Sequence, residues 1–189
     1  MTSGSATGVL VLLNGPPGIG KSTLARLLVQ DRPLALCLDI DLLWRSLGRW
    51  DEHLQQSGPL ARDLAVAAAR AHLTNGHSVV IPQFLGRLAF IERLEELAWE
   101  VDAPFSHIVL MDSKAAAVAR FLARASAADA SDQHREAAAM AGGEPGLVRF
   151  YDDLLAVLAA RPDAVVIPSI DGDLDGTYLR LRQVLAGVL

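Results

Sequence analysis

Residues 9–22 of the 189-residue chain read VLVLLNGPPGIGKS, and this stretch decides the fold. Its first five residues are all apolar and lead into the turn-forming residues Asn-Gly-Pro-Pro-Gly, which is typical of a short strand buried on both faces. From Lys21 onward leucines recur at helical spacing, and Pro33 marks the end of that helix. A buried strand that passes through a glycine-rich turn into a helix predicts the first unit of an α/β fold.

The turn itself matches the pattern Gly-x-x-x-x-Gly-Lys-Ser at positions 15–22. Glycines tolerate backbone angles that turn successive N–H groups toward one point, and the following helix adds the positive end of its dipole. Lys21 supplies a charge for the β- and γ-phosphates, and the Ser22 hydroxyl supplies a ligand for Mg²⁺. We therefore expect this phosphate loop to bind a nucleoside triphosphate through Gly15, Pro16, Pro17, Gly18, Ile19, Gly20, Lys21, Ser22 and Thr23.

The rest of the chain continues the alternation of strand and helix. Between the longer elements we expect a short helix that Asp41 caps and that runs through Leu47, and a surface loop over 50–58. The alternation predicts a single domain over 1–189, with a five-stranded parallel sheet that is covered by helices on both faces. The further strands are expected at 34–38, 78–81, 107–110 and 164–167, and the longer helices at 59–74, 88–101, 114–124, 147–160 and 175–188.

Two carboxylates, Asp39 and Asp41, follow the second predicted strand. Ligands of parallel α/β sheets bind beyond the carboxyl ends of the strands, so one carboxylate is a candidate general base for a substrate hydroxyl. Asp41 is favoured slightly over Asp39 as this base, and Asp39 with Ser22 is the candidate Mg²⁺ pair. The alternative is that Asp41 only caps the helix that begins at Leu42. Arg45 lies one turn later on the same face, where it is a candidate to hold an anionic substrate group or Asp41 itself.

The residues after the third predicted strand, PQFLGR at 82–87, include no acidic residue. Gln83 is neutral, so we expect it to orient a water or a polar substrate rather than to neutralise charge. Binding of the metal ion is then expected to depend on Ser22 and the two aspartates. Arg87 is expected either to cap the next helix or to face the substrate.

Three arginines lie on or after the helix that follows the fourth predicted strand. Arg120 and Arg124 are four residues apart and therefore share one face of the helix. The segment after them is small and polar, and we predict a mobile lid over about 124–146 that brings Arg124 and Arg135 to the γ-phosphate, with Arg120 behind them. The alternative for these arginines is a solvated helix face. Asp171, after the fifth strand, is expected beside the nucleotide base.

Composition restricts the possible partners. The net charge is −5 and the sequence pI is about 5.5, which argues against a large nucleic-acid-binding face. The single cysteine, Cys37, cannot form an internal disulfide, and no apolar run is long enough for a signal core or a membrane span. We therefore expect a cytoplasmic protein with a small-molecule substrate and with no nucleic-acid or membrane partner. The oligomeric state stays open.

The order of these parts resembles the P-loop small-molecule kinases, among them shikimate kinase, gluconate kinase and chloramphenicol phosphotransferase, and the chain also looks like AAA-type ATP-binding proteins of bacteria. The resemblance rests on the phosphate loop, on Asp39-Ile40-Asp41 and on the arginine-bearing segment after the fourth strand. It implies a three-layer P-loop NTPase fold with sheet order 2-3-1-4-5, and an ATP-binding loop after the fifth strand. The shikimate-binding Gly-Gly-x motif and the lid signature of nucleoside monophosphate kinases are both missing, so neither acceptor is supported.

These features together predict an ATP- and Mg²⁺-dependent phosphotransferase that moves the γ-phosphate to a hydroxyl of a small molecule. One alternative is an ATP-binding regulatory or switch protein with little or no transfer. Another is an antibiotic or nucleoside kinase that confers resistance, whose sign would be an apolar acceptor pocket with Trp44, Trp50 and Phe84. The sequence leaves the identity of the acceptor open.

Overall fold

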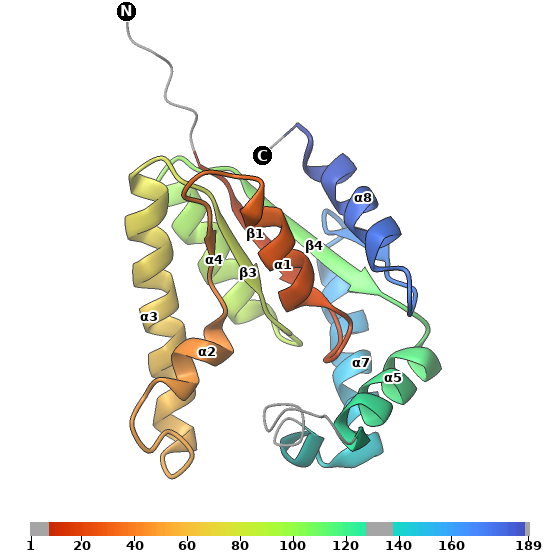
Figure 1. The fold of residues 1–189 in the computed structure, drawn as a ribbon. Helices are drawn as coiled ribbons and strands as arrows, with labels where there is room; N and C mark the ends of the chain where they lie inside the picture. Colours follow the sequence, from red (N-terminus) through yellow and green to blue (C-terminus); the bar gives the residue numbers. More distant parts are fainter. Residues whose placement is uncertain (1–7, 128–137, 188–189) are drawn as a thin grey trace, which may run out of the picture.

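The computed structural model describes residues 8–127 and 138–187. At its centre is a parallel sheet of five strands in the order β2-β3-β1-β4-β5 (Figure 1). The middle strand, β1, pairs on one side with β3 and on the other with β4, so that Leu12 lies opposite both Ile81 and His107. The predicted fold class and strand order are confirmed. The strands are β1 (Leu10–Asn14), β2 (Leu36–Cys37), β3 (Val79–Pro82), β4 (Phe105–Met111) and β5 (Val165–Pro168).

Helices cover both faces of this sheet and give three layers (Figure 1). Successive side chains of a strand point to opposite faces, and β1 divides its residues accordingly. Leu10 and Leu12 pack against α3 and α4, whereas Val11 and Leu13 pack against α1 and α8. The helices are α1 (Lys21–Gln30), α2 (Ile40–Arg45), α3 (Leu54–Thr74), α4 (Leu88–Glu100), α5 (Lys114–Ser126), α7 (Gly143–Ala160) and α8 (Leu174–Leu185).

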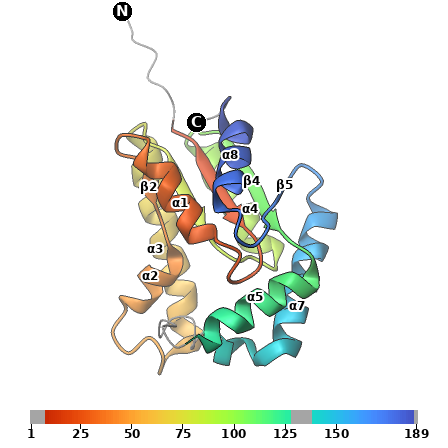
Figure 2. The ribbon, with the colours of Figure 1, turned by 45° about the vertical axis from the view of Figure 1, so that its right-hand side comes forward.

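The parallel sheet brings the carboxyl ends of its strands to one edge, at the lower side of Figure 1. Here the phosphate loop leaves β1, α2 follows β2, and the segment 83–87 follows β3. Figure 2 shows α1 and α2 on one side of this edge, with α5 and α7 on the other. Segments that are far apart in the sequence therefore meet where ligands of parallel sheets bind.

Two element boundaries differ from the sequence predictions around the second strand. The short helix begins at Ile40, because the Asp39 side chain, and not that of Asp41, caps it by accepting a hydrogen bond from the Asp41 N–H at 3.1 Å. Helix α3 begins at Leu54 and includes Pro59, where a surface loop over 50–58 was expected. Its early turns are held by buried Ser57, whose hydroxyl accepts a hydrogen bond from Trp44 Nε1 at 2.7 Å and donates one to the Trp50 carbonyl at 2.9 Å.

The described part of the predicted lid is largely helical, while the lid role of the segment stays a prediction. Residues 138–141 are helical and α7 begins at Gly143, four residues before the start predicted at Leu147. The reason is burial: Ala141 and Leu147 pack against Val118 and Phe121 of α5 in a small core of their own. The middle of the predicted lid, 128–137, lies outside the described residues.

A buried amide joins the phosphate loop to the segment after β3. Asn14, the last residue of β1, is fully buried, and its Oδ1 accepts hydrogen bonds from the N–H groups of Gly15 (2.8 Å) and Leu85 (2.9 Å). Its Nδ2 donates to the Leu85 carbonyl at 3.1 Å and lies 3.4 Å from Nε2 of His107. Buried polar groups are costly unless they are paired, so this arrangement strongly favours one placement of the two segments.

His107 lies beneath this amide, on β4. It is buried, and burial together with the nearby Arg161 guanidinium lowers its pKa to about 4, against the opposing effects of Asp163 and Glu95. The ring is therefore neutral at pH 7, which leaves Nε2 able to accept a hydrogen bond from Asn14.

The described residues also bear on membrane association. Within residues 8–127 and 138–187, none of the helices combines the length and the apolar character that spanning a bilayer requires.

A matched pair on α7 tests the importance of the core. Leu154 is fully buried and Leu155 is 44% exposed. We expect Leu154→Ala to lower the free energy of unfolding by about 2–5 kcal/mol, because it leaves a cavity, and Leu155→Ala to change it by less than about 0.5 kcal/mol. Urea unfolding followed by circular dichroism measures both, and equal effects would contradict this placement of α7.

His107 predicts a loss of stability in acid. In the unfolded chain a histidine has a pKa of about 6.5, so below that pH the unfolded state binds a proton that folded His107 does not. Acidification from pH 7 to pH 5 should therefore lower the free energy of unfolding by an amount on the order of 2 kcal/mol through this group. In His107→Gln, whose amide can still accept from Asn14, this part of the pH dependence should disappear. If the unfolding free energy of His107→Gln had the same slope against pH as that of the unchanged protein, this role of His107 would be disproved.

Candidate functional site

The phosphate loop has the backbone that its glycines predict. Gly15, Gly18 and Gly20 have φ angles of 146°, 77° and 104°, a region that side chains with a Cβ rarely adopt. At Gly15 the space is limiting as well, because a Cβ there would lie 2.6 Å from the Leu110 carbonyl oxygen on β4. The loop can therefore lie directly against the sheet edge and turn its N–H groups outward.

Lys21 begins α1 and folds back over this loop. Its Nζ donates hydrogen bonds to the carbonyls of Gly15 and Pro16, both at 2.9 Å. Burial lowers the pKa of Lys21 to about 8, although the negative charges of Asp41 and Asp39 act in the opposite direction. A phosphate group placed in the loop would add negative charge beside this ammonium and favour its protonated form.

Asp39 is the buried member of the acidic pair. Its Oδ1 caps α2, and its Oδ2 accepts a hydrogen bond from the Ser22 hydroxyl at 3.2 Å. The cap therefore fixes the carboxylate beside the start of α1. Ser22 and Asp39, which the sequence assigned to the metal, are brought together.

Asp41 is half-buried and faces β3. Its Oδ1 accepts a hydrogen bond from Nε2 of Gln83 at 3.2 Å. The Oε1 atom of Gln83 is buried and has no hydrogen-bond partner among the described residues. An unsatisfied buried acceptor of this kind is suited to a donor on a ligand, such as a hydroxyl.

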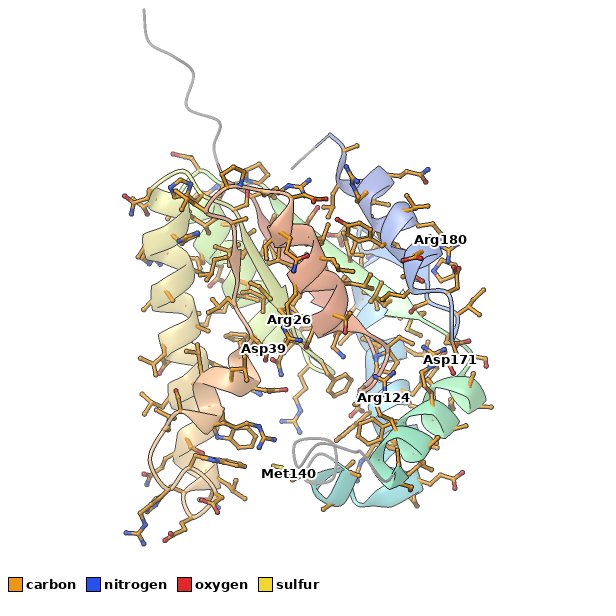
Figure 3. All side chains as sticks on the ribbon, in the orientation of Figure 1. Arg26, Asp39, Arg124, Met140, Asp171 and Arg180 are labelled. Atoms are coloured by element: carbon orange, nitrogen blue, oxygen red, sulfur yellow. The ribbon has the colours of Figure 1, made fainter. Side chains whose placement is uncertain are left out.

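One cleft of about 440 Å³ contains both halves of the predicted site. The phosphate loop contributes Gly18, Gly20, Lys21 and Ser22 to its wall, and the acidic side contributes Asp39, Asp41 and Gln83. Figure 3 shows Asp39 and Arg26 beside each other between α1 and α2, and Arg124 extending from α5 toward the phosphate loop. Met140 lies at the opposite, lower side of this space.

The arginines of α5 have different partners. Arg124 Nη1 donates to the Gly18 carbonyl at 3.1 Å, so this predicted lid residue does contact the phosphate loop. Arg120 is nearly buried and forms ion pairs with Asp112 and with Asp171, the latter with Nε and Oδ1 3.2 Å apart. The predicted base-side residue Asp171 is thus linked to α5. Arg135 lies outside the described residues.

Two further predicted substrate residues are not in this cleft. Arg45 does not line it, and its guanidinium lies 5.2 Å from the centre of the Trp50 ring. Arg87 occupies the N-cap position of α4 without a capping side-chain hydrogen bond, and it lines a neighbouring cavity. Of the three aromatics proposed for an acceptor pocket, Trp44 and Phe84 line the cleft and Trp50 does not.

Sequence reasoning missed several residues of the site. Arg26, Phe121, Met140 and Phe150 line the cleft, and Asn14 fixes its floor. Arg26 lies one turn after Ser22 on α1, so helical spacing alone was a usable signal for it. Phe150 reaches the cleft from α7, and Met140 reaches it from the helical residues 138–141 before α7. No local sequence pattern indicates either position.

The donor set fits Mg²⁺. Ser22 and Asp39 offer oxygen ligands, which hard cations prefer, and Mg²⁺ is usually held by one or two carboxylates together with substrate phosphates. In the described part of the chain, no group of three His, Cys, Asp or Glu side chains is placed to hold a metal ion. Phosphate oxygens and water would therefore have to complete the coordination of the ion.

A protein family and a known protein both match this chain in sequence. Residues 10–142 match the AAA domain family AAA_33. The chain is also 30% identical over 132 residues to a protein named adenylate kinase from Jannaschia sp. (strain CCS1). The aligned residues make up 65% of this chain and 69% of that protein.

Solved structures share the fold over almost the whole chain. A protein from Chloroflexus aurantiacus has a TM-score of 0.64 at 19% identity, covering 98% of this chain and 100% of that chain. A gluconokinase from Sinorhizobium meliloti 1021 has a TM-score of 0.58 at 14% identity, covering 96% and 97%. The family match, the phosphate loop and the sheet order agree, and the chain belongs to the AAA domain family AAA_33 of P-loop small-molecule kinases.

Proposed function

We propose that the protein transfers the γ-phosphate of ATP to a hydroxyl group of a small molecule. The observation that carries the proposal is the single cleft lined by both the phosphate loop and the Asp39, Asp41 and Gln83 group. The loop supplies a site for the phosphate donor, and the acidic side supplies groups that can bind and deprotonate an acceptor. Membership of a P-loop kinase family supports a nucleotide as the phosphate donor.

The hydrogen bonds support different roles for the two aspartates. Both oxygens of Asp39 are engaged, one by the Asp41 N–H and one by the Ser22 hydroxyl, which favours a fixed position beside Mg²⁺. Among the described residues, the Asp41 carboxylate accepts a side-chain hydrogen bond from Gln83 through Oδ1, and we assign its Oδ2 to accept the proton of an acceptor hydroxyl. Bound Mg²⁺ would neutralise charge that develops on the β- and γ-phosphates.

Arginines from α5 complete the proposed site. Arg124 already contacts the phosphate loop, where its charge would stabilise the transferred group, and we keep Arg135 as a second candidate for this role. Arg120, paired with Asp112 and Asp171, is better placed to organise the base side of the nucleotide.

The relative named adenylate kinase favours a second candidate, in which a phosphate group rather than a hydroxyl accepts. A panel that contains nucleoside monophosphates, polyols, hydroxy acids and hydroxyl-bearing antibiotics, incubated with γ-labelled ATP, separates the candidates. Label on a nucleoside monophosphate supports the second candidate, and label on an antibiotic supports a resistance kinase. ATP binding with no labelled product in the whole panel would support an ATP-binding switch instead.

Lys21 tests the donor side. We expect Lys21→Ala to reduce ATP turnover by at least about 100-fold, because the β- and γ-phosphates lose their main positive charge. The chain has one other lysine, Lys114, which pairs with Asp152 outside the cleft, and Lys114→Ala is the matched control. Phosphate release from ATP in the absence of acceptor measures both variants. Equal rates for them would refute a role of this loop in turnover.

The two aspartates test the acceptor side. Asp41→Asn should lower turnover by about 100-fold or more while the Kd for ATP stays within about twofold, because a base acts on the acceptor and not on the donor. Asp39→Asn should instead weaken ATP binding in the presence of Mg²⁺ but not in EDTA. Calorimetry measures the Kd for ATP, and formation of ADP in the presence of a labelled acceptor measures turnover. Full turnover of Asp41→Asn would exclude it as the base.

A further inference from the structure

A second cavity, of about 520 Å³, lies beside the cleft and shares Phe84 and Phe150 with it. The two rings are 5.0 Å apart between their centres and separate the two spaces. The cavity opens to solvent and is lined by α3, the segment after β3, the first turns of α4, and α7. A ligand that extends past these rings would therefore reach from the cleft into the cavity.

The charges around this cavity are mostly positive. Three arginines, Arg62, Arg87 and Arg93, line it together with two carboxylates, Asp63 and Asp153. This is a local excess of positive charge on a chain whose net charge is −5.

Most of these charges are not neutralised within the described residues. Arg93 is paired with Asp63 at 2.6 Å. Arg87 has no ion pair or hydrogen bond with any described side chain, and Arg62 has only a contact with the Phe90 ring at 5.6 Å from its centre. Helix α4 begins at this cavity, and its first turn contains no acidic residue. Two unpaired guanidinium groups at one cavity are the chemistry that binds a carboxylate, sulfate or phosphate.

The remaining wall is aromatic and closely packed. Phe84, Phe90 and Phe150 line it, and Gly86 lets the segment after β3 approach α7. A Cβ at Gly86 would lie 3.0 Å from Asp153 Cβ and 3.1 Å from Phe84 Cζ. Aromatic walls suit a flat or apolar body, whereas the Asp153 carboxylate suits a hydrogen-bond donor on the ligand.

We propose that this cavity binds the anionic end of the acceptor, so that the substrate class is a small organic anion with a flat apolar body and a hydroxyl. The assignment of the hydroxyl to Asp41 rests on the proposed function. The anion site itself rests only on the cavity and on Arg62 and Arg87. The two parts can therefore be tested separately.

Two dyes that differ by one charged group test the anion site. 8-Anilinonaphthalene-1-sulfonate carries a sulfonate, and N-phenyl-1-naphthylamine has the same ring system without it. We expect the folded protein to bind the sulfonate at least about tenfold more tightly, and Arg62→Gln/Arg87→Gln to lose this advantage while binding the neutral dye as before. Fluorescence titration gives both values of Kd.

The matched control is Arg49→Gln/Arg182→Gln. Arg49 pairs with Glu52 and Arg182 lies over the Tyr178 ring, so both charges are removed from sites outside the two cavities. This control should keep the preference for the sulfonate. Lys21→Ala should keep it as well, and that result would exclude the phosphate loop as the site where the dye binds. Unchanged melting temperatures and ATP affinity show that the arginine variants fold. Equal affinity for the two dyes, or a preference that survives in Arg62→Gln/Arg87→Gln, would overturn the anion site.

Transfer is tested with pairs of aromatic hydroxy acids and their neutral amides, using γ-labelled ATP. Labelling of the acids, with a KM that rises at least about tenfold in Arg62→Gln/Arg87→Gln, supports the substrate class. Equal labelling of acids and amides would overturn that class while the proposed transfer stands. If the dyes behave as expected but no hydroxyl compound is labelled, the anion site stands and the hydroxyl transfer fails.

Discussion

The placement of the whole site depends on the buried side chain of Asn14. Its amide is paired at the same time with the first residue of the phosphate loop and with both backbone groups of Leu85, after β3. One side chain thereby fixes the distance between the donor loop and the segment that carries Gln83 and Arg87. Because the amide is fully buried, a shift of either segment would leave a polar group unsatisfied, which costs about 1–3 kcal/mol.

The cap of α2 divides the acidic pair in a similar way. By accepting the Asp41 N–H, Asp39 starts the helix at Ile40, two residues earlier than expected, and turns its other oxygen to Ser22. Asp41 is then directed to Gln83, which directly follows β3. Two carboxylates separated by one residue thus have different surroundings, and a local feature of helix formation places one beside Ser22 and the other beside Gln83.

The sequence predicted most of the fold because hydrophobic periodicity and turn residues are local signals. It predicted β1, the phosphate loop and α1, and the resemblance supplied the strand order. It failed where distant contacts outweigh local preference. Trp44 and Trp50 hold the turns of α3 before Pro59 through Ser57, and packing against α5 accompanies the helical residues 138–141 and 143–146.

The same reasoning explains which site residues could be found. Lys21, Ser22 and the aspartates belong to short patterns that carry their own chemistry. Arg45 was assigned to the site by helical spacing, but its guanidinium lies over the Trp50 ring and does not line the cleft. Arg62 and Phe150 come from helices far apart in the chain, and only the tertiary structure brings them to neighbouring cavities.

The rings of Phe84 and Phe150 form a wall that belongs to both cavities, and this has a thermodynamic consequence. Interiors are packed closely enough that a ring displaced by a ligand on one side changes the space on the other. Binding free energies that are coupled in this way are reciprocal: whatever factor the nucleotide applies to the affinity of the acceptor, the acceptor applies to that of the nucleotide. A ligand that displaces either ring would therefore couple the occupancy of one cavity to that of the other.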